Sequence, residues 1–128
     1  MRPARTSAVF ALVLSLAALL LSTSGCKDTH VAATVSNRTS QPLALVEVDY
    51  PSASFGTQTL APGADFHYRF KVLGSGLIKI SYTDSARKVQ SSQGPYLTES
   101  ADGPINITIA PDGIHWQTTI PVITPPPN

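Results

Sequence analysis

The segment Phe66-His67-Tyr68-Arg69-Phe70-Lys71-Val72 carries the clearest fold signal in the chain. Its apolar and polar residues alternate without a break, which is the pattern of a β-strand with one buried and one solvated face. The alternation directs the four apolar residues toward a core and places His67, Arg69 and Lys71 together on the solvated face. The segment therefore predicts a strand of an antiparallel sheet that is covered on one face.

Seven further segments show this alternation or a shorter form of it, and glycine, proline or aspartate residues separate them. We expect strands over residues 31–35, 46–50, 78–82, 105–109 and 114–118, and short edge strands over 57–60 and 88–90. Strands at this spacing, with no helical period after residue 31, predict an all-β fold: a single antiparallel β-sandwich over residues 30–120. Its expected core comprises Val46, Val48, Phe66, Tyr68, Phe70, Ile78, Ile80, Ile107 and Trp116.

The beginning of the chain has the residue order of a secretory signal. Arg2 and Arg5 precede a stretch that is apolar from Ala8 to Leu21 except for Ser15, and small residues follow it. The apolar stretch has about 14 residues, whereas a membrane-spanning helix needs about 20. We therefore expect an N-terminal signal helix that is removed, rather than a retained transmembrane helix.

The run Leu21-Ser22-Thr23-Ser24-Gly25-Cys26 ends on the single cysteine of the chain and resembles the lipobox of bacterial lipoprotein precursors. Thr23 stands where leucine is usual in that family. The resemblance implies that residues 1–25 are removed, that Cys26 is lipidated, and that residues 26–29 tether the protein to a membrane. Lys27 follows the cysteine, which favours the outer membrane if the source is Gram-negative. The alternative is an ordinary secreted protein with a free thiol.

Charge and cysteine content exclude several classes of function. Removal of the signal leaves 103 of the 128 residues, enough for one small domain, and reduces nine basic side chains to seven, against eight acidic ones. This balance gives no basic footprint for nucleic acid, so we expect no nucleic-acid partner. With Cys26 lipidated, no thiol remains for a disulfide, a cysteine-rich metal site or a cysteine nucleophile.

The region after the signal resembles immunoglobulin-like and fibronectin-III-like sandwiches in its architecture. The residues that carry this likeness are Asn37-Arg38-Thr39, after the first expected strand, and Leu60-Ala61-Pro62-Gly63, before a middle strand. The chain has no pair of cysteines like that of antibody domains, and Trp116 lies late in the sequence. The likeness therefore implies the sandwich architecture and no particular family.

No residue pattern predicts a catalytic, cofactor or metal site, and we do not expect an enzyme. Ser85 and Lys88 have the S-x-x-K spacing of serine acyl-transferases, but they lie in an expected turn between strands. The histidines do not have the spacing of metal ligands. They are His30, His67 and His115.

Glu47 and Asp49 lie two residues apart, on one face of an expected strand. Paired carboxylates of this kind can serve glycoside hydrolysis or bind calcium. We interpret them instead as partners in pairs across a sheet, because oppositely charged neighbours commonly stabilise antiparallel strands. The basic residues available for such pairs are Arg69, Lys71 and Lys79.

The sequence thus predicts a non-catalytic binding or interaction module of a cell envelope. Its expected partners are the membrane, through Cys26, and envelope proteins. The candidate interaction face consists of His67, Arg69 and Lys71, which suit an acidic or polar partner. Two alternatives stay open: a structural or assembly component of an envelope complex, and a carbohydrate- or ion-binding module. Residues 121–128 form a proline-rich tail, interpreted as a loose terminus or a ligand for a partner.

Overall fold

The computed structural model describes Gly25 and residues 27–128. The predicted signal helix and the lipidation of Cys26 lie outside the described residues. Within the described part of the chain, eight strands follow one another without a helix: β1 (Val31–Asn37), β2 (Leu43–Tyr50), β3 (Ala53–Leu60), β4 (Asp65–Phe70), β5 (Gly76–Thr83), β6 (Val89–Leu97), β7 (Gly103–Ala110) and β8 (Gly113–Thr118). Accordingly, the described residues form no helix that is long and apolar enough to cross a membrane.

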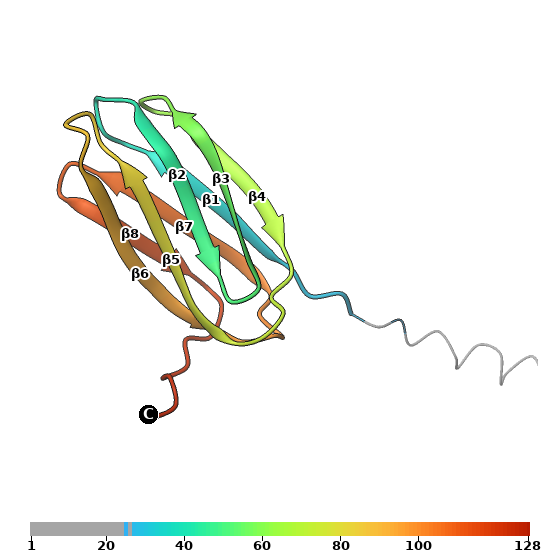
Figure 1. Cartoon of the computed structure of the whole chain (residues 1–128). Coiled ribbons are helices and arrows are strands. Elements are labelled where there is room, and N and C mark those ends of the chain that lie inside the picture. Colours follow the sequence, from blue (N-terminus) through green and yellow to red (C-terminus); the bar gives the residue numbers. More distant parts are fainter. Residues whose placement is uncertain (1–24, 26) are drawn as a thin grey trace, which may run out of the picture.

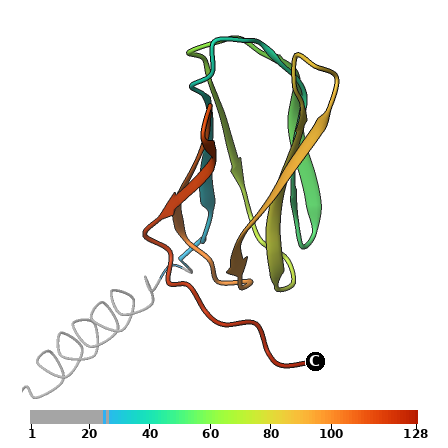
Figure 2. The same cartoon turned by 90° about the vertical axis from the view of Figure 1, so that its left-hand side faces the viewer.

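The strands form two sheets of four strands each, which pack face to face (Figure 1). One sheet has the strand order β4-β1-β7-β8 and the other has the order β3-β2-β5-β6. Figure 2 shows the two layers nearly edge-on. The all-β sandwich that the alternating segments predict is therefore confirmed.

The expectation of a purely antiparallel sandwich is wrong for one pair of strands. β1 and β7 pair in parallel, from Val31 opposite Gly103 to Asn37 opposite Ile109. Alternation along a strand fixes which face is buried, but parallel and antiparallel ladders both keep this period of two. The direction of a neighbouring strand therefore cannot be predicted from the alternation.

The core lies between the two sheets and consists mainly of branched aliphatic side chains. Of the nine predicted core residues, six are buried, and Phe66 and Trp116 are partly buried against them. Tyr68 is the exception, because it is 41% exposed. It lies on β4, at the edge of its sheet, where a side chain that points inward still reaches the open margin of the sandwich. The largest fully buried apolar side chains belong to Val31, Val35, Val46, Val48, Val72, Ile78, Ile80, Leu97, Ile105, Ile107 and Ile109.

Aromatic rings fill the margin of the sandwich at which β3 and β4 lie. The rings of Tyr50 and Phe70 stack with their centroids 4.1 Å apart. Those of Phe55 and Tyr68 stack with centroids 4.4 Å apart. Phe55 comes from β3 and Tyr68 from β4, so this pair joins the edge strands of the two sheets.

The opposite margin, between β6 and β8, is closed by Trp116. Its indole N–H donates a hydrogen bond to the hydroxyl of Ser92 at 2.9 Å, which links β8 to β6. Gly94 provides the space for the ring, because a Cβ at this position would collide with the indole. The closure of this margin therefore depends on the indole ring of Trp116 and on the lack of a side chain at Gly94.

β3 and β6 are longer than the sequence indicates. They have eight and nine residues, where the sequence predicts short strands over 57–60 and 88–90. Both are edge strands rich in serine, threonine and glutamine, so they alternate weakly. Backbone pairing with β2 and β5 makes β3 and β6 longer than the short segments in which apolar and polar residues alternate.

The two ends of the sandwich differ in what they carry. The segment that leads into β1 and the tail that follows β8 leave from one end, which we call the proximal end (Figures 1 and 2). The connections β1–β2, β3–β4, β5–β6 and β7–β8 lie at the other, distal end. Residues 121–128 contain no strand or helix and are exposed.

Candidate functional site

The predicted interaction face lies on the outer surface of the β4-β1-β7-β8 sheet. His67 and Arg69 of β4 stand opposite Thr34 and Ala32 of β1, and Lys71 follows the end of β4. All three predicted residues are exposed on this side of the molecule. The hydroxyl of Thr34 and Nδ1 of His67 share a hydrogen bond of 3.0 Å, which fixes the imidazole against the sheet.

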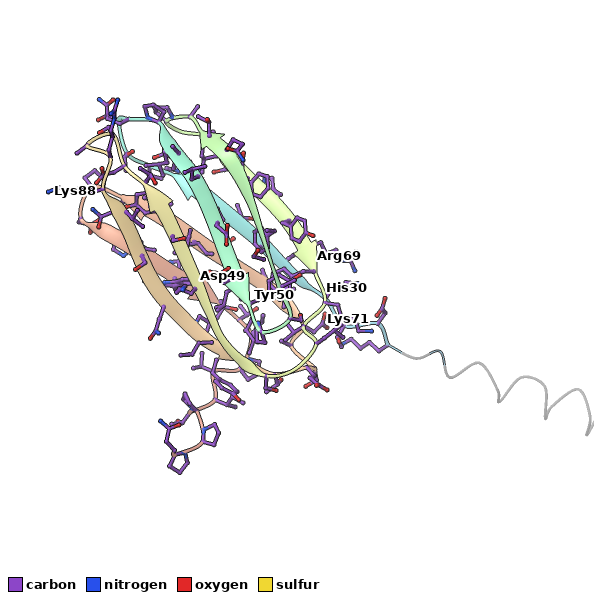
Figure 3. All side chains as sticks on the ribbon, in the orientation of Figure 1. His30, Asp49, Tyr50, Arg69, Lys71 and Lys88 are labelled. Atoms are coloured by element: carbon purple, nitrogen blue, oxygen red, sulfur yellow. The ribbon has the colours of Figure 1, made fainter. Side chains whose placement is uncertain are left out.

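Arg69 and Lys71 also contact the segment that leads into β1, at the proximal end (Figure 3). Nη2 of Arg69 lies 3.3 Å from Nδ1 of His30. A guanidinium can only donate, so this contact is a hydrogen bond in the tautomer in which Nδ1 carries no proton. Nζ of Lys71 donates to Oδ1 of Asp28 at 3.2 Å. Two of the three predicted residues are therefore engaged within the molecule.

Asp102 holds the same segment from the β6–β7 connection. Its carboxylate lies 3.1 Å from Nζ of Lys27 and accepts the backbone N–H of His30 at 3.2 Å. The hydrogen bond from Lys27, followed by that from His30, lowers the pKa of Asp102 below its ordinary value. The carboxylate is thus charged at neutral pH and binds the segment through several exposed contacts, each of which is weak.

The interpretation of Glu47 and Asp49 as partners in pairs across a sheet is confirmed for Asp49, but Arg69 and Lys71 are not the partners. The two carboxylates lie on β2, which belongs to the other sheet, so the core separates them from β4. Asp49 instead lies 3.8 Å from Nζ of Lys79, its neighbour across the β2–β5 ladder. The third basic residue considered from the sequence is therefore the one that forms the pair.

At the distal end, Asn37 fixes the β1–β2 connection. Its side chain is completely buried, and its Nδ2 donates to the carbonyl oxygens of Gln41 at 2.8 Å and Leu60 at 3.0 Å. Its Oδ1 accepts the backbone N–H of Thr39 at 2.9 Å and the Thr39 hydroxyl at 2.7 Å. Because a buried amide is costly unless it is hydrogen-bonded, these four bonds define the shape of the loop.

Arg38 joins this loop to the β3–β4 connection. Its Nη2 donates to Oδ1 of Asp65 at 2.7 Å, and its Nη1 donates to the carbonyl oxygen of Gly63 at 3.2 Å. A hydrogen bond from Ser36, followed by the one from Arg38, lowers the pKa of Asp65. Two distal connections from different parts of the chain are thus held together by one guanidinium.

A groove of about 370 Å³ opens at the distal end. It lies between the β1–β2, β5–β6 and β7–β8 connections, so three separate parts of the chain form its walls. Its apolar surface comes from Leu43, Ala110, Pro111 and the ring of Tyr82, and its polar groups come from Thr39, Gln41, Asp84, Ser85, Gln90 and Asp112. Such a mixture of apolar walls and convergent polar groups is typical of a small binding site.

Asp84 organises the wall of the groove that the β5–β6 connection forms. Its Oδ1 accepts the backbone N–H groups of Ala86 and Lys88, both at 2.9 Å, and its Oδ2 accepts the side-chain amide of Gln90 at 3.1 Å. The N–H of Lys88, followed by the Gln90 amide, lowers the pKa of Asp84. Burial, followed by the charge of Asp84, raises the pKa of the Tyr82 hydroxyl, so this group stays a hydrogen-bond donor at neutral pH.

The remaining candidates from the sequence do not converge. His67 and His115 lie on β4 and β8, the two outer strands of one sheet, and His115 instead contacts Asp112 at 2.8 Å. Among the described residues, no group of three or more histidine, cysteine or acidic side chains could hold a metal ion. Ser85 and Lys88 lie in the β5–β6 connection, in the turn that Asp84 caps.

Comparisons with known proteins support the fold and give no information on function. No protein-family model and no curated protein matches the chain. Among solved structures, the chain is similar to the NMR structure of a protein from Eubacterium rectale. The TM-score is 0.51, with 14% sequence identity over 77% of this chain and 96% of that chain. At such low identity the likeness supports the sandwich fold, and function has to be argued from the site.

The sequence did not reveal the distal groove. Its walls come from residues 39–43, 82–90 and 110–113, and only the pairing of the strands brings these stretches together. One local signal is present: Asn37 is the last residue of β1 and lies two residues before Thr39, an arrangement that favours side-chain capping of a turn. It indicates an ordered loop, but not what the loop lines.

Proposed function

We propose that this protein is a membrane-tethered, non-catalytic binding module of a bacterial cell envelope. In this proposal residues 1–25 are a signal that is removed, Cys26 is the lipidated residue, and residues 26–29 are the tether. Residues 30–120 form the binding domain, and residues 121–128 are a tail. All eight strands, from Val31 to Thr118, fall within the proposed domain.

The observation that carries the proposal is the placement of the groove at the end of the sandwich opposite the N-terminal segment. A tether of four residues extends at most about 14 Å. Lipid on Cys26 would therefore keep the proximal end close to the membrane and direct the groove away from it. The groove would then be accessible to a polar partner in the surrounding compartment.

The anchor proposal is supported by the sequence around Cys26. A single acyl chain gives marginal attachment, whereas the several chains of the lipoprotein family would make attachment effectively permanent. Lys27 directly after the cysteine favours the outer membrane in a Gram-negative source. We also propose that the sandwich is immunoglobulin-like, which its two stacked sheets and the connections that cross between them support.

The experiment has two arms. Radiolabelled palmitate is expected to enter the wild-type chain but not Cys26→Ser, and label retained by the mutant would contradict the anchor. In the second arm, the lipidated protein is used to capture partners from its own envelope, which are identified by mass spectrometry. Gln41→Ala combined with Tyr82→Phe removes hydrogen-bonding groups from the groove with little change in packing.

Gln117→Ala is the matched control for the groove variant, because Gln117 is exposed on β8 and does not line the groove. We expect at least one captured protein to be lost with the groove variant and kept with the control. If both variants capture the same proteins as the wild type, the groove is not the binding site.

A further inference from the structure

The four edge strands of the sandwich differ in how they are protected against pairing with another strand. The strand orders make β3, β4, β6 and β8 the edges. An edge exposes unpaired N–H and C=O groups, and proteins usually block it with charged residues, prolines, bulges or short length. These devices are visible on three of the four edges.

β4 carries Asp65 and Arg69, so its edge is charged. β6 contains Pro95, and its register with β5 shifts between Leu77 and Lys79. β8 has six residues, two fewer than β3 and three fewer than β6. Each of these three edges therefore has at least one feature that disfavours the addition of a strand.

β3 has none of these features. Its eight residues, ASFGTQTL, contain neither a charge nor a proline. Its register with β2 runs without a shift from Leu43 opposite Leu60 to Tyr50 opposite Ala53. In an antiparallel pair, alternate residues direct their backbone groups away from the partner, so about half of the residues of β3 offer hydrogen bonds outward. One carbonyl oxygen, that of Thr59, already accepts the Thr57 hydroxyl at 3.2 Å.

The surfaces on both sides of the β3 edge can receive side chains. On the inner side, the ring of Tyr68 of β4 is 41% exposed and forms an aromatic ledge, which rests on the buried ring of Phe55. On the outer side lies a shallow hollow of about 330 Å³ at Gly56, bordered by Glu47, Gln58 and the exposed Leu45. A Cβ at Gly56 would collide with the carbonyl oxygen of Val46, so glycine is required for the close approach of β3 to β2 at this point.

We propose that the β3 edge binds an extended polypeptide segment of a partner protein, which adds to the β3-β2-β5-β6 sheet as a further strand. Backbone hydrogen bonds would supply affinity, and alternating side chains on the ledge and in the hollow would supply specificity. The segment that fits carries no acidic side chain toward the hollow, because Glu47 borders the hollow and β3 itself offers no charge to pair with. Its inward positions are aromatic or β-branched, because these side chains pair well with Phe55 and Thr57 across strands.

The choice of a partner rather than a second copy of this chain rests on the lipid anchor proposed above. Two copies joined antiparallel through β3 would be related by a two-fold axis, which reverses the direction of every strand. Their proximal ends, and with them their anchors, would then point in opposite directions. Two anchors in the same membrane require both proximal ends to face that membrane. When the strands run away from the membrane surface, this pairing places one of the two proximal ends on the far side.

Hydrogen exchange of the full chain in detergent, followed by mass spectrometry, tests the proposal. The probe is a synthetic peptide with blocked ends and the sequence of β3, ASFGTQTL, which has the chemistry required of the partner. The control peptide carries Thr57→Pro, which removes a backbone donor and disfavours a strand. We expect the first peptide to slow exchange of the β3 amides about tenfold. The control peptide is expected to leave exchange unchanged.

Two variants sharpen this test. Tyr68→Ala removes the ledge and is expected to weaken peptide binding at least about fivefold, while protection of the β1 amides confirms that the variant is folded. Gln117→Ala, at an exposed residue of β8 in the same sheet but remote from β3, is the matched control and should leave binding unchanged. Unaltered β3 exchange with the peptide, or equal slowing at β4, β6 and β8, would overturn the proposal.

Sedimentation of the full Cys26→Ser chain separates the two possible occupants. A dimer that the peptide dissociates would show that β3 pairs with a second copy and would overturn the choice of a partner. A monomer whose β3 amides the peptide still protects would support that choice. Because peptide protection does not require lipid, failure of the anchor and failure of the β3 edge are distinguishable.

Discussion

The two margins of the sandwich, where the edge strands of the two sheets meet, are closed by different kinds of contact. At the margin of β3 and β4, several rings stack on one another and leave Tyr68 partly in solvent. At the margin of β6 and β8, Trp116 fits over Gly94 and is fixed by one hydrogen bond to Ser92. Stacked rings adapt to small displacements, whereas the tryptophan requires one arrangement. We infer that the first margin suits binding and that the second serves stability.

The largest expected effect on stability comes from a substitution in the buried part of the aromatic margin. Phe70 is 4% exposed and stacks with Tyr50. Phe70→Ala should lower the free energy of unfolding by about 3–5 kcal/mol, because it leaves a cavity that the neighbouring strands cannot fill. Urea unfolding followed by circular dichroism measures the loss. A variant with an unchanged unfolding midpoint would show that this margin is not part of the core.

At the tryptophan margin, Gly94→Ala should cost about 1–3 kcal/mol, because the added methyl group displaces the indole ring. In a chain that already carries Trp116→Ala, the same substitution should cost little, since the ring is gone. A double-mutant cycle measures this coupling. Equal costs in both backgrounds would mean that Gly94 does not act through Trp116.

Ser92→Ala tests the hydrogen bond at the same margin. Loss of the indole–hydroxyl bond should cost about 1 kcal/mol, since the indole N–H is then left without its partner. Trp116 is the single tryptophan of the chain, so its fluorescence reports on this margin alone. We expect the emission maximum to shift in Ser92→Ala and to stay unchanged in Ser91→Ala, the exposed neighbour on β6.

The connection that leads into β6 should make the tryptophan margin sensitive to acid. Hydrogen bonds from Lys88 and Gln90 lower the pKa of Asp84 below its ordinary value of 3.8. A carboxyl with a depressed pKa stabilises the folded state above its unfolded pKa, and this contribution is lost as the pH falls through the folded pKa. The stability difference between wild type and Asp84→Asn should therefore be constant near neutral pH and shrink below about pH 3.8. Unfolding curves over pH 2–7 would detect a difference that instead grows in acid.

The smallest effect is expected where the aromatic margin meets the proximal end. Arg69→Ser with Lys71→Ser removes exposed contacts to His30 and Asp28, so stability should change by only about 0–1 kcal/mol. If the predicted face of His67, Arg69 and Lys71 binds an envelope partner, this variant should lose that partner in the capture experiment. If the variant captures the same proteins as the wild type, Arg69 and Lys71 serve only to hold the N-terminal segment.

The core could be predicted from the sequence because burial follows a local period. Phe70, Ile78 and Ile107 are buried as the alternation predicts. The same rule fails for Tyr68, because exposure at the margin depends on which strands end up at the edges, and this depends on pairing between distant segments. The parallel pairing of β1 with β7 was missed for the same reason.

The candidate sites were less predictable than the core. The outward direction of Arg69 and Lys71 follows from alternation, but their contacts with His30 and Asp28 follow from where the chain enters the sheet. The distal groove and the β3 edge arise from loops and edges whose residues show no period. Sequence patterns report on buried faces more reliably than on the margins and ends, where binding would occur.

The parallel pair of β1 and β7 has a consequence for the order of folding. β1 lies between β4 and β7, so the centre of its sheet is incomplete until residues near the C-terminal end of the chain are available. At a synthesis rate of about 5–20 residues per second, β7 follows β1 by several seconds. Throughout that interval the emerging chain lacks a central neighbour for its first strand, and contacts between such distant segments form slowly. If the chain is exported, this delay would help to keep it unfolded until it has crossed the membrane.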